Sequence, residues 1–158
     1  KILAAFFLVL TATSAFSQGI SLSSGVLDYS DDNKSAGFLE ATYTFSEAKS
    51  FNTKIGNFFP ITGAMLTEDN AAMVYAGIKA DYKIGNFVMS PRFAPGYYDE
   101  GDGKDLGHAV EFKSQINLGW DLGPNSNAGL SYSHISNASL GDKNPGANNI
   151  AFTLYRQY

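Results

Sequence analysis

The sequence contains no cysteine, few charged residues and no long apolar run. Without cysteine the chain forms neither a disulfide scaffold nor a zinc site with thiolate ligands. The longest unbroken apolar run covers residues 2–10, well short of the roughly 18 to 20 residues that a membrane-spanning helix needs. Only 16% of the residues are charged, against about 25% in ordinary soluble domains, which indicates a surface that is not mainly in contact with water.

The first 17 residues have the pattern of a secretory signal peptide. Lys1 precedes the apolar run, and Ala15 and Ser17 occupy the −3 and −1 positions of a possible cleavage site. A short buried helix or strand is the alternative interpretation. We expect residues 1–17 to be removed and residues 18–158 to fold as one domain. Without Lys1 the formal charge falls from −4 to −5, which disfavours nucleic-acid binding.

The remaining sequence alternates apolar and polar residues with a period of two, which is typical of β-strands. The clearest example is the segment 110–120. One of its faces carries Val110, Phe112, Ile116, Leu118 and Trp120, and the other carries Glu111, Lys113, Gln115, Asn117 and Gly119. Eight segments read in this way, at about 19–29, 36–46, 55–66, 72–83, 87–98, 109–121, 127–138 and 148–158.

The connections between these segments alternate between polar loops and tighter turns. Loops rich in Asp, Asn, Glu and Gly occur at 31–35, 67–70, 99–107 and 139–147, whereas the connections at 85–86 and 122–126 are tighter. An even number of strands of about ten residues with unequal turns predicts an all-β fold, an eight-stranded antiparallel transmembrane up-and-down β-barrel. The sparse charges of the polar face would then pair inside a narrow lumen. A soluble ligand-binding β-barrel, with its apolar face inside, is the alternative.

A candidate catalytic pair lies in the seventh segment. His134 and Ser136 share the face of Leu130 and Tyr132, so we expect both to point outward, with Cβ atoms roughly 6 to 7 Å apart. An ionisable side chain that faces a bilayer is usually functional. A histidine within reach of a serine can supply the base, and the serine the nucleophile, of a serine esterase. The alternative is a hydrogen-bonded pair near the membrane interface. Asn148, across the hairpin, also faces outward.

The segment 133–148, SHISNASLGDKNPGAN, resembles the lipid A 3-O-deacylase family of outer-membrane acyl-ester hydrolases. The stretch 98–107, YDEGDGKDLG, and the strand at 111–114 are similar to the same family, and the local similarity covers about residues 92–158. The resemblance implies an eight-stranded barrel in the outer membrane with its active site on the lipid-facing outside. It also implies hydrolysis that releases an ester-linked 3-hydroxyacyl chain from lipid A.

The resemblance assigns roles to individual residues. His134 matches the general base, Ser136 the nucleophile, and Asn144 of the NPG turn a side chain that helps to bind the oxyanion. Backbone donors near Ala138 and Ser139 would complete the oxyanion site. No metal or cofactor is expected. The expected partners are lipopolysaccharide as substrate, outer-membrane lipids and the barrel-assembly machinery, and a homodimer is left open.

The acid position departs from the family pattern because it holds Asn148. An amide orients a neutral imidazole through its carbonyl oxygen, but it offers no negative charge when the imidazolium forms. The nearest carboxylate in sequence is Asp142, whose loop position makes it a poor substitute. A catalytically weakened or inactive barrel that binds lipid is therefore the alternative to an active esterase.

Overall fold

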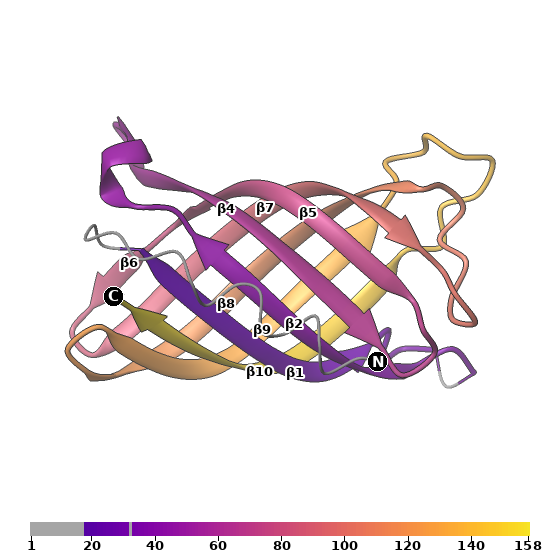
Figure 1. Ribbon diagram of the computed structural model, residues 1–158, viewed down its shortest axis with the longest axis horizontal. Helices are drawn as coiled ribbons and strands as arrows, with labels where there is room; N and C mark the ends of the chain where they lie inside the picture. Colours follow the sequence, from indigo (N-terminus) through magenta and orange to yellow (C-terminus); the bar gives the residue numbers. More distant parts are fainter. Residues whose placement is uncertain (1–17, 32) are drawn as a thin grey trace.

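The computed structural model describes residues 18–31 and 33–158, and within them the alternating segments form β-strands (Figure 1). The eight long strands are β1 (Gly19–Leu27), β2 (Ala36–Thr44), β4 (Gly56–Thr67), β5 (Ala72–Ala80), β7 (Phe87–Asp99), β8 (Val110–Gly123), β9 (Ser126–Ser136) and β10 (Ala147–Gln157). The short elements are the 3-10 helix η2 (Glu47–Lys49) and the strands β3 (Phe51–Thr53) and β6 (Tyr82–Ile84). No helix in these described ranges has the length and apolar character to cross a membrane. The predicted signal peptide, residues 1–17, lies outside the described residues.

The eight long strands close into an antiparallel barrel. Each long strand pairs with the next one along the chain, and β1 also pairs with β10. The short strand β3 extends the hairpin with β4, and β6 continues the line of β5 against β7. Closure gives every long strand a partner on both sides, which a barrel in lipid requires. The predicted fold class is therefore confirmed, including the number of long strands.

The predicted boundaries of the long strands agree with the structure within a few residues, and the end of the first strand differs in an informative way. The first segment was expected to run to residue 29, but β1 ends at Leu27 and Asp28 begins a turn. Asp28 has a φ of +48°, and its carbonyl accepts a hydrogen bond of 3.0 Å from the Asp31 amide. Aspartate is among the few residues that adopt this left-handed conformation readily. The turn therefore directs the Asp28 side chain away from the alternating strand pattern.

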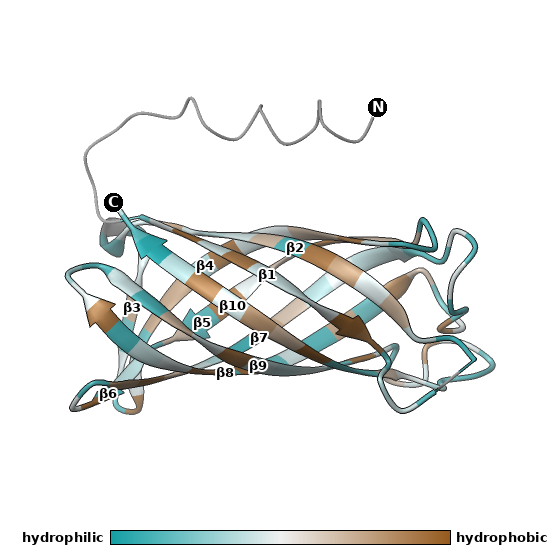
Figure 2. Cartoon of the chain, turned by 90° about the horizontal axis from the view of Figure 1, so that it is seen from below, coloured by the Kyte–Doolittle hydropathy of each residue, from teal (hydrophilic) through white to brown (hydrophobic). Residues whose placement is uncertain are grey.

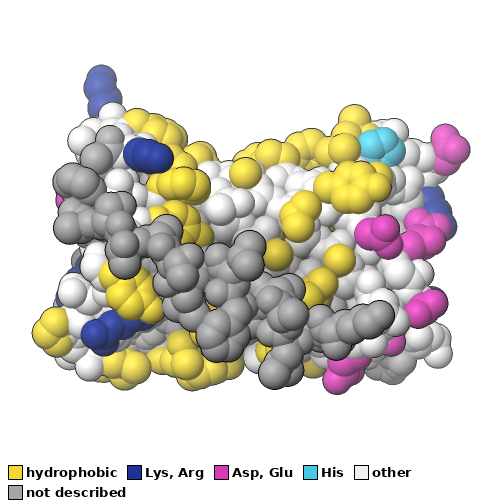
Figure 3. Space-filling view, in the orientation of Figure 1, with side chains coloured by type: hydrophobic (Ala, Val, Ile, Leu, Met, Phe, Trp, Pro, Cys, Tyr) yellow, Lys and Arg dark blue, Asp and Glu magenta, His cyan; other side chains and the backbone are white. Residues whose placement is uncertain are grey.

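The polar loops lie at one end of the barrel, and the tight turns lie at the other end with both termini of the described chain. The Tyr158 amide donates a hydrogen bond of 2.7 Å to the Gln18 carbonyl, so the first and last described residues are adjacent. The loop between β9 and β10 projects from the opposite end (Figure 1). Acidic side chains gather at this loop end (Figure 3).

Hydrophobic and hydrophilic residues alternate along the strands (Figure 2), and burial shows that the interior of the barrel is polar and its exterior apolar. Glu40 and Lys113 are 4% and 2% exposed and form an ion pair in the lumen, where Tyr75 also donates a hydrogen bond of 2.6 Å to Glu40. The large exposed side chains of the strands are apolar, among them Leu39, Val74, Phe93, Leu118, Trp120, Leu130, Phe152 and Leu154. A soluble barrel would place this apolar face inside, so that alternative is wrong.

Candidate active site

The candidate residues lie on the outer face of the barrel near the loop end. Ser133 and Ile135 are buried, so the alternation of β9 turns His134 and Ser136 to the outside. Asn148, near the start of β10, is the direct cross-strand partner of His134. The sequence pattern therefore predicted correctly that these three side chains share one face.

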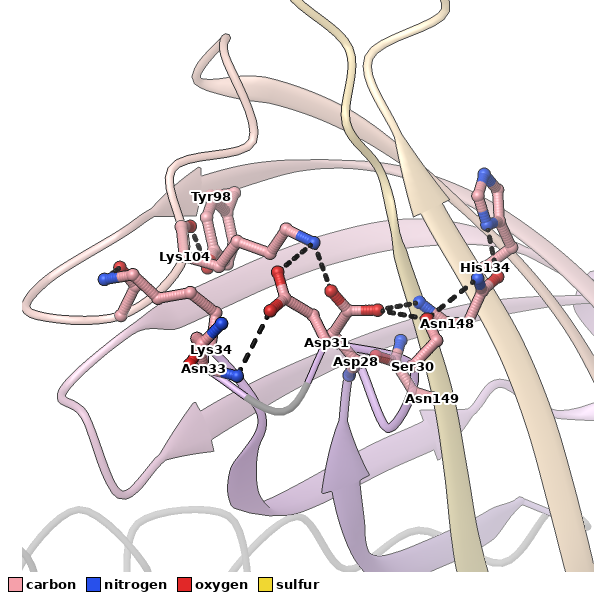
Figure 4. Close-up of polar contacts among 11 residues, drawn as sticks. Asp28, Ser30, Asp31, Asn33, Lys34, Tyr98, Lys104, His134, Asn148 and Asn149 are labelled. Carbon is pink, nitrogen blue, oxygen red and sulfur yellow. Dashed lines mark hydrogen bonds and ion pairs between the residues drawn. The ribbon is translucent and has the colours of Figure 1, made fainter.

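The imidazole of His134 is held by Asn148. The His134 Nδ1 and Asn148 Oδ1 atoms are 2.8 Å apart (Figure 4). The Tyr132 hydroxyl donates a second hydrogen bond, of 3.0 Å, to the same Asn148 oxygen. An amide oxygen only accepts, so the proton of the neutral ring is on Nδ1 and the lone pair is on Nε2. This tautomer is the one that a general base at Nε2 needs.

Asn148 is in turn held by the turn that follows β1. Its backbone amide donates a hydrogen bond of 3.1 Å to Asp28 Oδ1, and its side-chain Nδ2 lies 3.5 Å from Ser30 Oγ (Figure 4). The Ser30 hydroxyl donates to Asp28 Oδ1 at 2.9 Å. Asp28 also forms an ion pair with Lys104. Burial by itself raises the pKa of the Asp28 carboxyl, but hydrogen bonds from Lys104, the Asn148 amide and Ser30 bring it below the ordinary value of 3.8.

Gly146 provides the space for the histidine ring. A Cβ atom at this position would stand 2.9 Å from His134 Cε1 and 3.3 Å from His134 Nε2. The φ of Gly146 is +64°, a conformation that other residues adopt only with strain. The ring therefore rests against bare backbone on the side of Nε2.

The Ser136 hydroxyl makes no hydrogen bond within residues 18–31 and 33–158. It lies on the same face as His134 but is not engaged by the imidazole in this structure. The chain turns immediately afterwards, and Leu140 donates a backbone hydrogen bond of 3.0 Å to Asn137. The two residues between them, Ala138 and Ser139, both have positive φ, at +51° and +64°. Strained backbone of this kind often accompanies functional sites.

Asn144 supports the turn after Ser136. Its Oδ1 accepts a hydrogen bond of 3.1 Å from the Asn137 amide, which leaves Nδ2 as the atom that could donate to an oxyanion. The Asn137 side chain donates to the carbonyls of Leu106 and Lys143, at 2.8 Å each. The Asn137 side chain thereby links the loop between β7 and β8 to the loop between β9 and β10, beside the site.

The residues that support the histidine were not predicted from the sequence. Tyr132, Ser30 and Asp28 were not singled out, and Gly146 was noted only as part of the NPG turn. Asp142, the nearest carboxylate in sequence, is exposed, and within the described residues it forms no hydrogen bond or ion pair with His134. Among the described residues, no group of three or more His, Asp or Glu side chains is arranged to hold a metal ion.

Comparisons with known proteins place the chain in a family. The model of the family described as "Lipid A 3-O-deacylase (PagL)" matches residues 23–156. A curated relative, "Lipid A deacylase PagL" of Bordetella bronchiseptica (strain ATCC BAA-588 / NCTC 13252 / RB50), is 40% identical over 55 residues. These residues are 35% of this chain and 31% of the relative, so less than a third of the relative's length is matched.

Two solved structures have the same fold. The "outer membrane enzyme PagL" superposes with a TM-score of 0.68 at 16% identity, covering 87% of this chain and 98% of that one. A structure from "De novo design of transmembrane beta-barrels" gives a TM-score of 0.60 at 10% identity, covering 92% and 98%. The fold is thus that of small outer-membrane barrels, and the chain belongs to the PagL family of lipid A 3-O-deacylases.

Proposed function

We propose that this protein is an outer-membrane serine esterase that removes an ester-linked 3-hydroxyacyl chain from lipid A. The observation that carries the proposal is the arrangement on the lipid-facing side of β9 and β10. There the Nδ1 of His134 is fixed by Asn148, Nε2 is left available as a base, and Ser136 shares the same face. Family membership supports the choice of lipid A as the substrate.

The reaction would proceed through an acyl-enzyme. Nε2 of His134 takes the proton of Ser136 as Oγ attacks the ester carbonyl, and the developing oxyanion meets Nδ2 of Asn144 and the amides of Ala138 and Ser139. The imidazolium then protonates the sugar oxygen, which leaves with its hydrogen. Water, deprotonated by His134, cleaves the acyl-enzyme and releases the 3-hydroxy acid. The Ser136 hydroxyl has to approach Nε2 when substrate binds, as catalytic hydrogen bonds often do.

The position of the site along the barrel suits this substrate. Outer-membrane barrels place long loops outside the cell and short turns in the periplasm. His134 and Asn148 lie next to the long loops, at the level of the outer leaflet, where lipid A resides. Export with removal of residues 1–17 and insertion by the barrel-assembly machinery belong to the same proposal.

A second candidate is a lipid-binding barrel with little or no catalytic activity. Asn148 favours it because an amide carries no charge to stabilise the imidazolium. The absence of a hydrogen bond at Ser136 within the described chain favours it as well. In this case the fold and the lipid contacts would be retained, and no acyl chain would be released.

Mass spectrometry of lipid A separates the two candidates. The protein is expressed in a diderm bacterium whose lipid A carries an ester-linked 3-hydroxyacyl chain, and folding is verified by heat-modifiable gel migration. We expect lipid A lighter by one hydroxyacyl chain with the wild type and unchanged lipid A with Ser136→Ala. Ser24→Ala, which alters an exposed serine on the outer face of β1, is the matched control and should act like the wild type. Unchanged lipid A with folded wild-type protein would instead support the lipid-binding barrel.

A further inference from the structure

Asp28, a carboxylate from outside the predicted catalytic set, forms a hydrogen bond with Asn148. Asp28 is 2% exposed, and its Oδ1 accepts hydrogen bonds from the Asn148 amide at 3.1 Å and from the Ser30 hydroxyl at 2.9 Å. The Tyr29 amide donates a further bond, of 3.0 Å, to the Asn148 carbonyl. The turn after β1 therefore forms hydrogen bonds with Asn148, the residue that orients His134.

The direction of these hydrogen bonds fixes the orientation of the Asn148 amide. An ionised carboxylate only accepts, so the Ser30 hydroxyl must donate its hydrogen to Asp28. The Ser30 oxygen then presents a lone pair, which suits the Asn148 Nδ2 donor at 3.5 Å. The carbonyl oxygen of the amide is thereby turned toward Tyr132 and the imidazole. A reversed amide would place its oxygen against the Ser30 oxygen, whose hydrogen is already donated to Asp28, and would break the chain of bonds.

The same chain of hydrogen bonds couples the Asp28 carboxylate electrostatically to His134. Each bond from Asp28 through Ser30 and Asn148 is aligned with the next, and aligned hydrogen bonds polarise one another. Lys104 faces Asp28 from the loop between β7 and β8 and also lies 3.4 Å from Asp31. Within residues 18–31 and 33–158, Lys104 is the charged side chain that pairs with Asp28, and it shares its charge between the Asp28 and Asp31 carboxylates.

We propose that Asp28 is a positioning residue that takes over, through Ser30 and Asn148, the part that a carboxylate at position 148 would play. It orients the amide, holds His134 in the tautomer with the proton on Nδ1, and supplies the remote negative charge that favours the imidazolium. The inference rests on the proposed esterase function and names a residue for it that lies about 120 positions from Asn148 in sequence.

The test compares two variants that each remove one negative charge beside Lys104. Asp28→Asn preserves the shape and suits the positive φ, because asparagine also adopts this conformation readily. Asp31→Asn removes the other carboxylate near Lys104 but touches neither Asn148 nor His134. Both proteins are purified in detergent and assayed for release of 3-hydroxy acid from lipopolysaccharide across a range of pH.

We expect Asp28→Asn to lower kcat about ten- to a hundredfold with little change in KM, the range found for outer partners that orient metal-bound histidines. The acidic limb of the rate profile should move to lower pH, because loss of a negative charge disfavours the protonated base. Asp31→Asn should stay within about twofold of the wild type. Adding Asn148→Asp to the Asp28→Asn variant should restore the rate, because the charge returns next to the imidazole. Loss of a merely structural contact would not be repaired in this way.

Equal rates and pH profiles for the two single variants, or failure of Asn148→Asp to restore the rate, would overturn the inference while leaving the esterase function intact. If folded wild-type protein releases no acyl chain, the proposed function is wrong, and the inference is then judged by proton NMR in detergent. The downfield Nδ1–H signal of His134 should persist in the wild type and Asp31→Asn and be lost in Asp28→Asn. An identical signal in all three proteins would refute the role of Asp28.

Discussion

Replacing Gly146 by alanine tests the position of the histidine ring. The added Cβ would stand 2.9 Å from Cε1 and 3.3 Å from Nε2 of His134, so either the ring or the NPG turn has to move by several tenths of an ångström. The positive φ of +64° adds a backbone cost of about 1 to 2 kcal/mol, which a closed barrel should tolerate. We expect the variant to fold and to lose activity about a hundredfold, the effect of a small misplacement of a catalytic group.

Gly85 offers a matched control at the opposite end of the barrel. Its φ is +61°, nearly that of Gly146, but no atom lies within 4 Å of a Cβ placed there. Gly85→Ala therefore carries the backbone cost without the collision. The assay measures the rate of hydroxyacyl release from purified lipopolysaccharide, with heat-modifiable migration as the measure of folding. A folded Gly146→Ala variant with the wild-type rate would refute the placement of the ring, as would an equal loss in Gly85→Ala.

Three further predictions follow from the contacts. Glu40→Ala leaves the buried Lys113 ammonium unpaired, so the free energy of unfolding in urea should fall by about 3 to 5 kcal/mol, and replacing both partners by apolar residues should recover most of it. Tyr132→Phe removes one of the two donors to Asn148 Oδ1 and should lower kcat about fivefold, corresponding to about 1 kcal/mol, without altering heat-modifiable migration. Because the pKa of Asp28 is lowered in the folded protein, its ionised carboxylate stabilises the folded state above pH 3.8, and this stabilisation is lost as the pH falls through the lower folded pKa. Acid titration of the folded fraction should show this loss in the wild type and not in Asp28→Asn.

The fold was predictable because strand alternation is a local signal. Lumen residues such as Lys113 and outer residues such as Trp120 alternate along one segment, and the even strand count required closure. The short elements η2 and β3 and details at the ends of the long strands escaped prediction. The fourth segment, 72–83, was expected as one strand, but Asp81 interrupts it; its carboxylate pairs with Lys79 and accepts a hydrogen bond from Ser90. Ser90 belongs to another strand, β7, and alternation within one segment does not reveal such a partner.

Only the part of the candidate site that lies on the β9–β10 hairpin was predictable from the sequence. Parity and hairpin register placed His134, Ser136 and Asn148 on the same face, since both are local properties of β9 and β10. Asp28 was missed because the first segment was expected to continue through residue 29. The signal was nevertheless available in the predicted topology. In a closed meander the first strand is antiparallel to the last, so the end of β1 lies beside the start of β10, and an acidic residue there falls next to Asn148.

The most direct test of the esterase site is covalent labelling of its nucleophile. A fluorophosphonate with a long alkyl chain reacts with a serine only when a neighbouring base activates it. Purified, folded protein is treated in detergent, and the labelled peptide is identified by mass spectrometry. We predict one label, on Ser136, and no label on the His134→Ala variant. Labelling at another residue, or an unlabelled wild-type barrel, would contradict it.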